Sequence, residues 1–125
     1  MIFDSYKVNP QHRGRLPQGQ KSRWTVDQWE ELRLFSLAKE HEWKCREDHI
    51  LWALSSRATA LQAVGTDGKE DLFIAKYVAD HQHQWHGYPV SPRQFDIPPS
   101  EVIKAWVKDG LVSKAVGDRI LRGKL

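Results

Sequence analysis

Leu72-Phe73-Ile74-Ala75-Lys76-Tyr77-Val78 is the stretch of this sequence that decides its fold. Side chains alternate between the two faces of a strand, and here both faces are mostly apolar. A strand of this kind is covered on both sides, so we expect it to lie centrally in a sheet. Lys76 is the exception, and we expect its ammonium group to reach water or an ion-pair partner.

Turn signals and a further strand flank this central segment. Gly65-Thr66-Asp67-Gly68 comes before it and predicts a turn, because Asp-Gly tolerates positive φ at little cost. A further strand is expected over 84–90, ended by Pro89 and Pro92. These segments predict a small antiparallel β-sheet of two or three strands.

Helical patterns occupy the rest of the chain. Thr25-Val26-Asp27-Gln28 matches a capping box, so a helix should start there and run to about residue 40. The apolar residues between positions 50 and 54 predict a second helix over about 46–57. Pro98-Pro99-Ser100-Glu101 predicts the start of another, with Gly110 as its left-handed C-cap. Ser113 is expected to cap a final short helix.

The order of these elements indicates the fold class. We expect an α+β protein with an N-terminal arm, one or two helices, a small antiparallel β-sheet of 2–3 strands and a C-terminal helix pair. Three tryptophans on apolar helical faces should be buried: Trp29, Trp52 and Trp106. Two that lie beside charged residues should be exposed: Trp24 and Trp43.

Length and composition suit a single domain. A chain of 125 residues is long enough to form its own core. We expect one α+β domain over 24–125 and a basic, flexible or extended arm over 1–23, where prolines and glycines interrupt any periodicity. The single cysteine excludes an internal disulfide and a multi-cysteine zinc module. With no membrane-spanning stretch and no signal-peptide pattern, we expect a cytoplasmic protein without a membrane partner.

Charge is distributed unevenly along the chain, although its net value is only +3. Residues 1–24 hold five bases and one acid, and residues 104–125 hold six bases and two acids, around an acidic middle. Two basic ends that met in space would form a surface that attracts a polyanion. The alternative is that these ends are solvated or neutralise the acidic middle of the same molecule.

The segment Trp85-His86-Gly87-Tyr88-Pro89-Val90-Ser91-Pro92-Arg93 combines aromatic, basic and conformationally restricted residues. Exposed aromatics on a rigid loop suit stacking on a nucleobase or docking of a partner. Alternatively, Trp85 and Tyr88 fill the core where the strand leaves the sheet.

These features favour a small non-enzymatic module that binds an anionic partner, and among such partners they favour nucleic acid (RNA or DNA). The residues expected to contact it are Arg13, Arg15, Lys21, Arg23, Trp85, His86, Tyr88, Arg93, Arg119, Arg122 and Lys124. A different class is a protein–protein interaction module, acting as an adaptor or an inhibitor of a partner protein.

An enzymatic alternative is a metal-independent ribonuclease. His83 and His86 would act as base and acid, and Arg93 would hold the phosphate. His81 and His83 lie on the same side of an extended chain and are the metal-ligand candidates, but their spacing to His86 matches no specific zinc motif. We expect no cofactor, and the sequence does not fix the oligomeric state.

Overall fold

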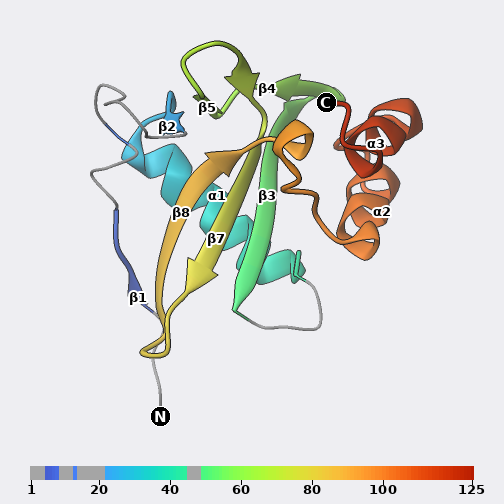
Figure 1. Ribbon diagram of the computed structural model, residues 1–125. Coiled ribbons are helices and arrows are strands. Elements are labelled where there is room, and N and C mark those ends of the chain that lie inside the picture. The colour runs from blue at the N-terminus through green and yellow to red at the C-terminus, as the bar shows by residue number, and fades with distance from the viewer. Residues whose placement is uncertain (1–4, 9–12, 14–21, 45–48) are drawn as a thin grey trace.

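The computed structural model of the chain describes residues 5–8, 13, 22–44 and 49–125 (Figure 1). In chain order its elements are β1 (Ser5–Tyr6), β2 (Arg23–Trp24), α1 (Gln28–His41), β3 (Ile50–Arg57), β4 (Ala60–Gln62), β5 (Gly65–Thr66), β6 (Asp71–Leu72), β7 (Ile74–Ala79), β8 (Gln84–Val90), the 3-10 helix η2 (Pro92–Gln94), α2 (Ser100–Lys108) and α3 (Lys114–Leu121). None of the helices within the described ranges is long and apolar enough to cross a membrane.

Most strands belong to one curled sheet of five strands in the order β1-β8-β7-β3-β4. Strand β7 lies at its centre, as the apolar pattern predicts, and pairs antiparallel with both β3 and β8. It begins only at Ile74, because Leu72 of the predicted strand belongs to β6. The edge strand β1 runs parallel to β8. A second sheet of three short strands, β2-β5-β6, lies beside the end of β8.

The expectation of a small antiparallel sheet of two or three strands is therefore wrong, although the protein combines helices and strands in an α+β arrangement. The main error is the helix predicted over 46–57, because Ile50–Arg57 forms the long strand β3. Residues 45–48 lie outside the described part of the chain. A short apolar run lacks the periodicity that separates a buried strand from a buried helix. Strands β1 and β2 have two residues each, too few to produce any pattern.

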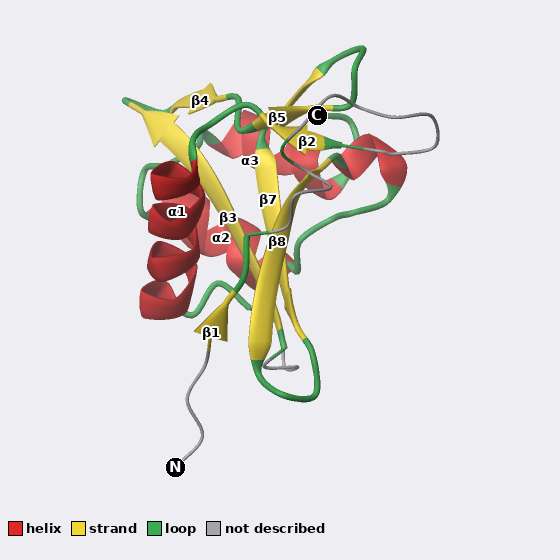
Figure 2. Cartoon of the chain, turned by 90° about the vertical axis from the view of Figure 1, so that its left-hand side faces the viewer, coloured by secondary structure: helices red, strands yellow, loops and turns green. Residues whose placement is uncertain are grey.

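The two sides of the large sheet are covered differently. Helix α1 packs along one side, whereas the segment from η2 to α2 lies on the other (Figures 1 and 2). On the α1 side, the Phe35 ring lies 5.4 Å from the Tyr77 ring and 5.5 Å from the Trp85 ring, measured between centroids. Leu34, Tyr77 and Trp85 belong to the buried hydrophobic core, and the partly buried Phe35 packs against it.

The tryptophan predictions are confirmed for two residues and wrong for three. Trp52 and Trp106 are buried as expected. Trp24 and Trp43 are buried although charged residues flank them, and the Trp24 indole N–H donates to the carbonyl of Gly87 at 3.2 Å. Trp29 is 80% exposed, because α1 faces the sheet with the side of the helix that carries Glu31, Leu34 and Ala38.

Several local signals are confirmed, and one is displaced. Gly110 has φ of 77° after α2, and the Ser113 hydroxyl caps α3 by accepting from the Val116 amide. Helix α1 is capped by Asp27, which accepts from the Glu30 amide at 2.8 Å, and not by Thr25 as the capping box predicts. The strand expected over 84–90 is β8.

The described ends of the chain lie far apart. Strand β1 pairs with Gln84 and Trp85 at the start of β8, whereas the carbonyl of Lys124 accepts from Arg93, just beyond the end of β8. At about 3.3 Å per residue, β8 separates these two places by roughly 20 Å. Figure 1 shows the same separation between β1 and the C-terminus. Most of the predicted arm over 1–23 lies outside the described residues.

Candidate nucleic-acid interface

The sheet has a partly uncovered face, which we call the open face and define by Lys76, Val78, His86 and Tyr88. Registers place Lys76 beside Tyr88 and Val78 beside His86. Neighbouring residues in each strand point to the α1 side, so these four side chains point away from it. All four are half-buried.

Two contacts hold Lys76 in place on the open face. Its ammonium nitrogen lies 5.1 Å from the centroid of the Trp52 ring and 3.0 Å from Oδ1 of Asp96. Of the two alternatives predicted for this lysine, water or an ion-pair partner, the structure shows the ion pair. Lys76 therefore links the open face to the segment that follows η2.

Strand β8 sends its aromatic residues to opposite sides. Trp85 is 3% exposed and packs against Phe35, so it belongs to the core. Gly87 points to the same side, where a Cβ would lie 2.3 Å from Cδ1 of Tyr77. Tyr88 lies on the open face. Of the two alternatives for this segment, core filling therefore describes Trp85, while Tyr88 is half-buried and packs against the core from the open face.

The end of β8 leads to an exposed aromatic side chain. Ser91 starts η2 by accepting from the Arg93 amide, and Phe95 follows in a left-handed conformation with φ of 71°. Phe95 is 92% exposed, while the next residue, Asp96, turns back to Lys76. Sequence analysis missed Phe95, whose one signal is an aromatic residue among polar neighbours in a segment bounded by Pro92 and Pro98.

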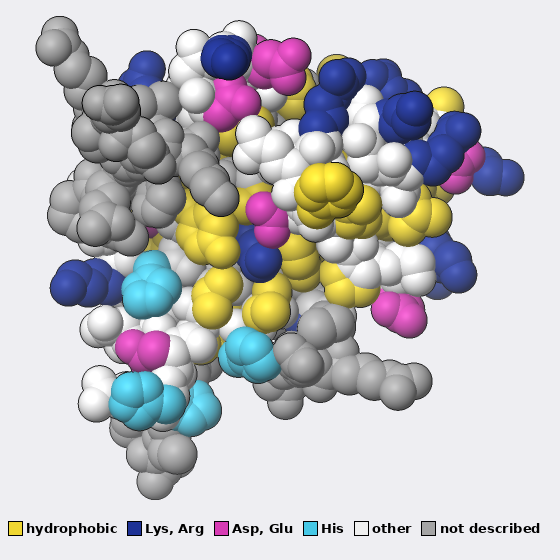
Figure 3. Space-filling model, in the orientation of Figure 1, with side chains coloured by type: hydrophobic (Ala, Val, Ile, Leu, Met, Phe, Trp, Pro, Cys, Tyr) yellow, Lys and Arg dark blue, Asp and Glu magenta, His cyan; other side chains and the backbone are white. Residues whose placement is uncertain are grey.

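Four of the predicted contact residues gather near the C-terminus, and we call them the cationic corner: Arg93, Arg119, Arg122 and Lys124. Guanidinium nitrogens of Arg93 and Arg119 lie 3.3 and 3.5 Å from the Lys124 carbonyl oxygen. Nε of Arg122 donates to the Asp118 carbonyl at 3.4 Å. Figure 3 shows Lys and Arg side chains concentrated in this region, around α3.

The charges of the cationic corner are not neutralised locally. The guanidinium groups of Arg93, Arg119 and Arg122 donate to backbone carbonyls. Within the described ranges, no carboxylate forms an ion pair with any of the four side chains. Arg93 and Arg119 also line a hollow of about 640 Å³ whose other wall carries Glu70 and Asp71. The surface is therefore cationic on the side of η2 and α3 and acidic across the hollow.

The described basic residues of the N-terminal segment have contacts that differ from those of the cationic corner. Nη2 of Arg13 lies 2.6 Å from Oε1 of Glu31, whose side chain is completely buried, and Nη1 donates to the Val26 carbonyl. The guanidinium also lies 5.9 Å from the Trp24 ring centroid. Arg23 is half-exposed on β2, next to Thr66 of β5. Arg15 and Lys21 lie outside the described residues.

The structure does not bring the three candidate ribonuclease residues together. His83 lies in the β7–β8 turn and lines a pocket of about 450 Å³ on the α1 side, whereas His86 belongs to the open face. Arg93 lies beyond the other end of β8, in η2. His81 and His83 form no metal site with a third ligand among the described residues.

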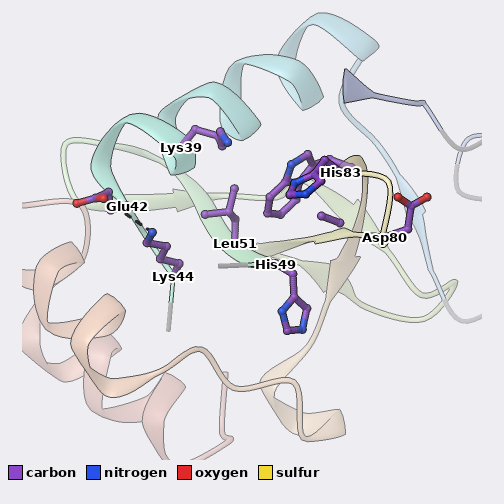
Figure 4. A pocket seen from close by; sticks show the side chains of 9 residues that line it. Lys39, Glu42, Lys44, His49, Leu51, Asp80 and His83 are labelled. Atoms are coloured by element: carbon purple, nitrogen blue, oxygen red, sulfur yellow. Dashed lines mark ion pairs between the residues drawn. The ribbon is translucent and has the colours of Figure 1, made fainter. Parts of the chain in front are cut away.

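The pocket beside His83 combines basic and acidic side chains (Figure 4). Nζ of Lys39 lies 5.4 Å from the centroid of the Trp85 ring, and Nζ of Lys44 lies 3.8 Å from Oε1 of Glu42. The carboxylate of Asp80 accepts from the amides of Gln84 and Gln82, and these bonds lower its pKa. Figure 4 shows the labelled side chains spread around the hollow, with Lys44 pointing to Glu42.

No known protein family matches the sequence, and comparison with curated proteins and with solved structures finds no similar protein. The function is therefore inferred from the arrangement of the side chains described above.

Proposed function

We propose that this protein binds single-stranded nucleic acid, RNA or DNA, across the cationic corner and the open face. The observation that carries this proposal is the position of Phe95. Its ring is 92% exposed and lies two residues beyond Arg93 of the corner and one residue before Asp96, which contacts Lys76 of the open face. Cationic and aromatic groups therefore follow one another along η2.

The phosphate-binding part of the proposal rests on the charges of the corner. Arginine offers several N–H donors in a planar fork that suits phosphate oxygens, and its charge persists at every physiological pH. Because no described carboxylate pairs with Arg93, Arg119 or Arg122, binding a phosphate breaks no existing ion pair. It releases counterions from the nucleic acid instead, which favours binding at low salt.

The base-binding part rests on Phe95 and Tyr88. Aromatic rings stack on unpaired bases, and such stacking contributes about 1–3 kcal/mol per base. Bases in a duplex already stack on each other and present only their edges, so an exposed ring favours a single strand. Phe95 beyond β8 and Tyr88 on it supply two such positions along the same path.

The geometry gives less support to a metal-independent ribonuclease. General acid–base chemistry on one ribose requires the base, the acid and the phosphate-binding group within hydrogen-bond reach of it. Two of the three candidates, His86 and Arg93, lie near opposite ends of β8, and His83 lines a pocket on the other side of the sheet.

Fluorescence anisotropy with labelled twelve-nucleotide oligouridylate and oligothymidylate tests the proposal. With three or four phosphates contacted, affinity should fall about 20- to 50-fold between 50 and 200 mM salt. Arg119→Glu/Arg122→Glu should weaken binding at least about tenfold, and Phe95→Ala at least about fivefold. The matching charge change away from the corner, Lys7→Glu/Arg33→Glu, should reduce affinity no more than about threefold.

Two results would overturn the proposal. One is the absence of oligonucleotide binding at 50 mM salt, and the other is binding that depends neither on salt nor on the corner. Co-purification of a stoichiometric protein in place of nucleic acid would favour the interaction-module alternative.

A further inference from the structure

The groove between α2 and α3 is a second surface, separate from the nucleic-acid interface. We propose that it binds an acidic amphipathic helix of a partner protein. The groove has a volume of about 330 Å³ and lies on the side of α3 away from Arg119. This inference does not depend on the proposed nucleic-acid binding.

The floor of the groove is apolar. Ile103 and Val107 of α2 face Gly117 and Leu121 of α3 across it. Gly117 lets the helices approach closely, because a Cβ there would lie 2.8 Å from Cγ2 of Val107. Leu121 is 47% exposed, which is high for a large apolar side chain in a core-facing helix. A partner that covers Leu121 would gain from burying this apolar surface.

The rim of the groove is basic. Lys104 and Lys108 line it on α2, and Lys114 lines it at the start of α3. Among the described residues that line the groove, Asp118 is the one acidic side chain. The three lysines are exposed, and none of them forms an ion pair with a carboxylate of the described residues. Three free positive charges against one negative charge complement an acidic partner.

The dimensions of the groove suit a helix of two to three turns. Helices α2 and α3 have nine and eight residues, so each is roughly 12–14 Å long. Lys104 and Lys108 lie four residues apart on one face, so two carboxylates with the same spacing on a partner helix can meet them. Apolar anchors between those carboxylates would then cover Val107 and Leu121, as in other complexes that place a helix in a groove.

The same lysines suit a nucleic acid less well. Phosphates and sugars would leave the apolar floor exposed, whereas an amphipathic helix covers the floor and pairs with the rim. Arg119 and Val116 lie on the other face of α3, beside the hollow that contains Arg93. A change at Leu121 can therefore separate the two surfaces.

Selection from a phage-displayed library of fourteen-residue peptides tests the inference. The library has apolar residues at helical spacing and random residues elsewhere, and it is selected in parallel on the wild type, Leu121→Ser and Lys104→Glu/Lys108→Glu. The winning sequences are then measured as labelled free peptides by anisotropy. Lys7→Glu/Arg33→Glu is the control of equal charge, and circular dichroism confirms that every variant is folded.

In the selection on the wild type, we expect the recovered peptides to carry Asp or Glu at positions four residues apart, on either side of the apolar anchors. Those peptides should bind Lys104→Glu/Lys108→Glu at least about tenfold more weakly and Leu121→Ser at least about threefold more weakly, with little change in the control. Leu121→Ser should keep the oligonucleotide affinity of the wild type.

Three results would overturn the inference. The first is enrichment of basic peptides or of none above background, and the second is equal binding of the selected peptides to Leu121→Ser. The third is self-association of the wild type in analytical ultracentrifugation that Leu121→Ser abolishes, because the occupant would then be a second copy of this chain.

Discussion

Arginine side chains on the two sides of the large sheet differ in whether a carboxylate pairs with them. On the α1 side, Arg13 forms an ion pair with the buried carboxylate of Glu31 and stacks on Trp24, so its charge serves the fold. Beyond the open face, Arg93 and Arg119 both donate to the Lys124 carbonyl, and neither forms an ion pair with a carboxylate of the described residues. Charge counted along the chain cannot make this distinction, because it depends on whether a carboxylate lies within reach. Arg13 and Arg119, which come from two segments of equal net charge, therefore differ in whether a carboxylate neutralises them.

The largest expected effect comes from removing the buried carboxylate. Glu31→Gln keeps the shape of the side chain but leaves the Arg13 guanidinium without its counter-charge, and breaking a buried pair costs about 3–5 kcal/mol. Urea denaturation followed by circular dichroism measures this change. Glu30→Gln is a matched control, because the neighbouring Glu30 pairs with Arg33 on the surface and should cost no more than about 1 kcal/mol. Equal losses in both variants would contradict a structural role for Arg13.

Substitutions at two neighbouring residues of β8 should have different effects on stability, because their side chains point to opposite sides of the sheet. Gly87→Ala should cost about 1–3 kcal/mol in unfolding free energy, because its Cβ would lie 2.3 Å from Cδ1 of Tyr77 and 2.9 Å from the Tyr6 hydroxyl. His86→Ala changes the adjacent residue on the open face and should stay within about 0.5–1 kcal/mol. Thermal and urea unfolding of both variants tests this order. A reversed order would mean that the two sides have been assigned incorrectly.

The α1 side should also show its own pH dependence. Burial, followed by the hydrogen bond to Glu31, raises the pKa of Tyr6 above its ordinary value of 10.0. The stabilising contribution of neutral Tyr6 is fully present below pH 10, and it declines as pH rises above that value towards the folded-state pKa. The loss between pH 10 and 11 should be about 1 kcal/mol from this group.

Tyr6→Phe provides the comparison for that pH dependence. The unfolding free energy of this variant, measured between pH 9 and 11, should fall less steeply than that of the wild type. Tyr77, whose pKa burial also raises, remains in both proteins and contributes equally. Identical slopes would show that the Tyr6 hydroxyl is not held in its neutral form by the fold.

The smallest effects are expected where a charge on the open face already has a partner. Lys76→Met removes a half-exposed pair with Asp96 and should change stability by no more than about 1 kcal/mol. It should also leave the salt dependence of oligonucleotide binding nearly unchanged. Arg122→Gln, by contrast, should reduce the slope of log affinity against log salt by about 0.7, the value for one phosphate contact on a single strand. Equal slopes in both variants would contradict the distinction between basic side chains that form an ion pair and those that do not.

Local sequence signals predicted some elements correctly. The strand over 84–90, the left-handed Gly110 and the Ser113 cap depend on residues within a few positions of one another, and all three are confirmed. The helix predicted over 46–57 failed because the run at 50–54 has no decisive periodicity. It became a strand through pairing with β7, in which Ile50 lies beside Val78. Tertiary pairing of this kind overrides weak local preference.

The candidate site was predictable only in part. Arg93, Arg119, Arg122 and Lys124 were among the predicted contacts, and the structure brings these four together. Phe95 was missed because a lone aromatic residue in a loop has no sequence pattern that indicates its exposure. The tryptophans illustrate the same limit, since Trp29 lies in an apolar stretch and is exposed whereas Trp24 lies among bases and is buried.

The sequence by itself determined the central strand around Tyr77, the strand Gln84–Val90, the caps of the last two helices and the accumulation of bases at both ends. Only the tertiary structure decided which bases stay free, because the partner of Arg13 lies 18 residues away in sequence and the acceptor of Arg93 lies 31 away. Backbone conformation responds to near neighbours, whereas burial of a charge depends on groups that the folded sheet brings together.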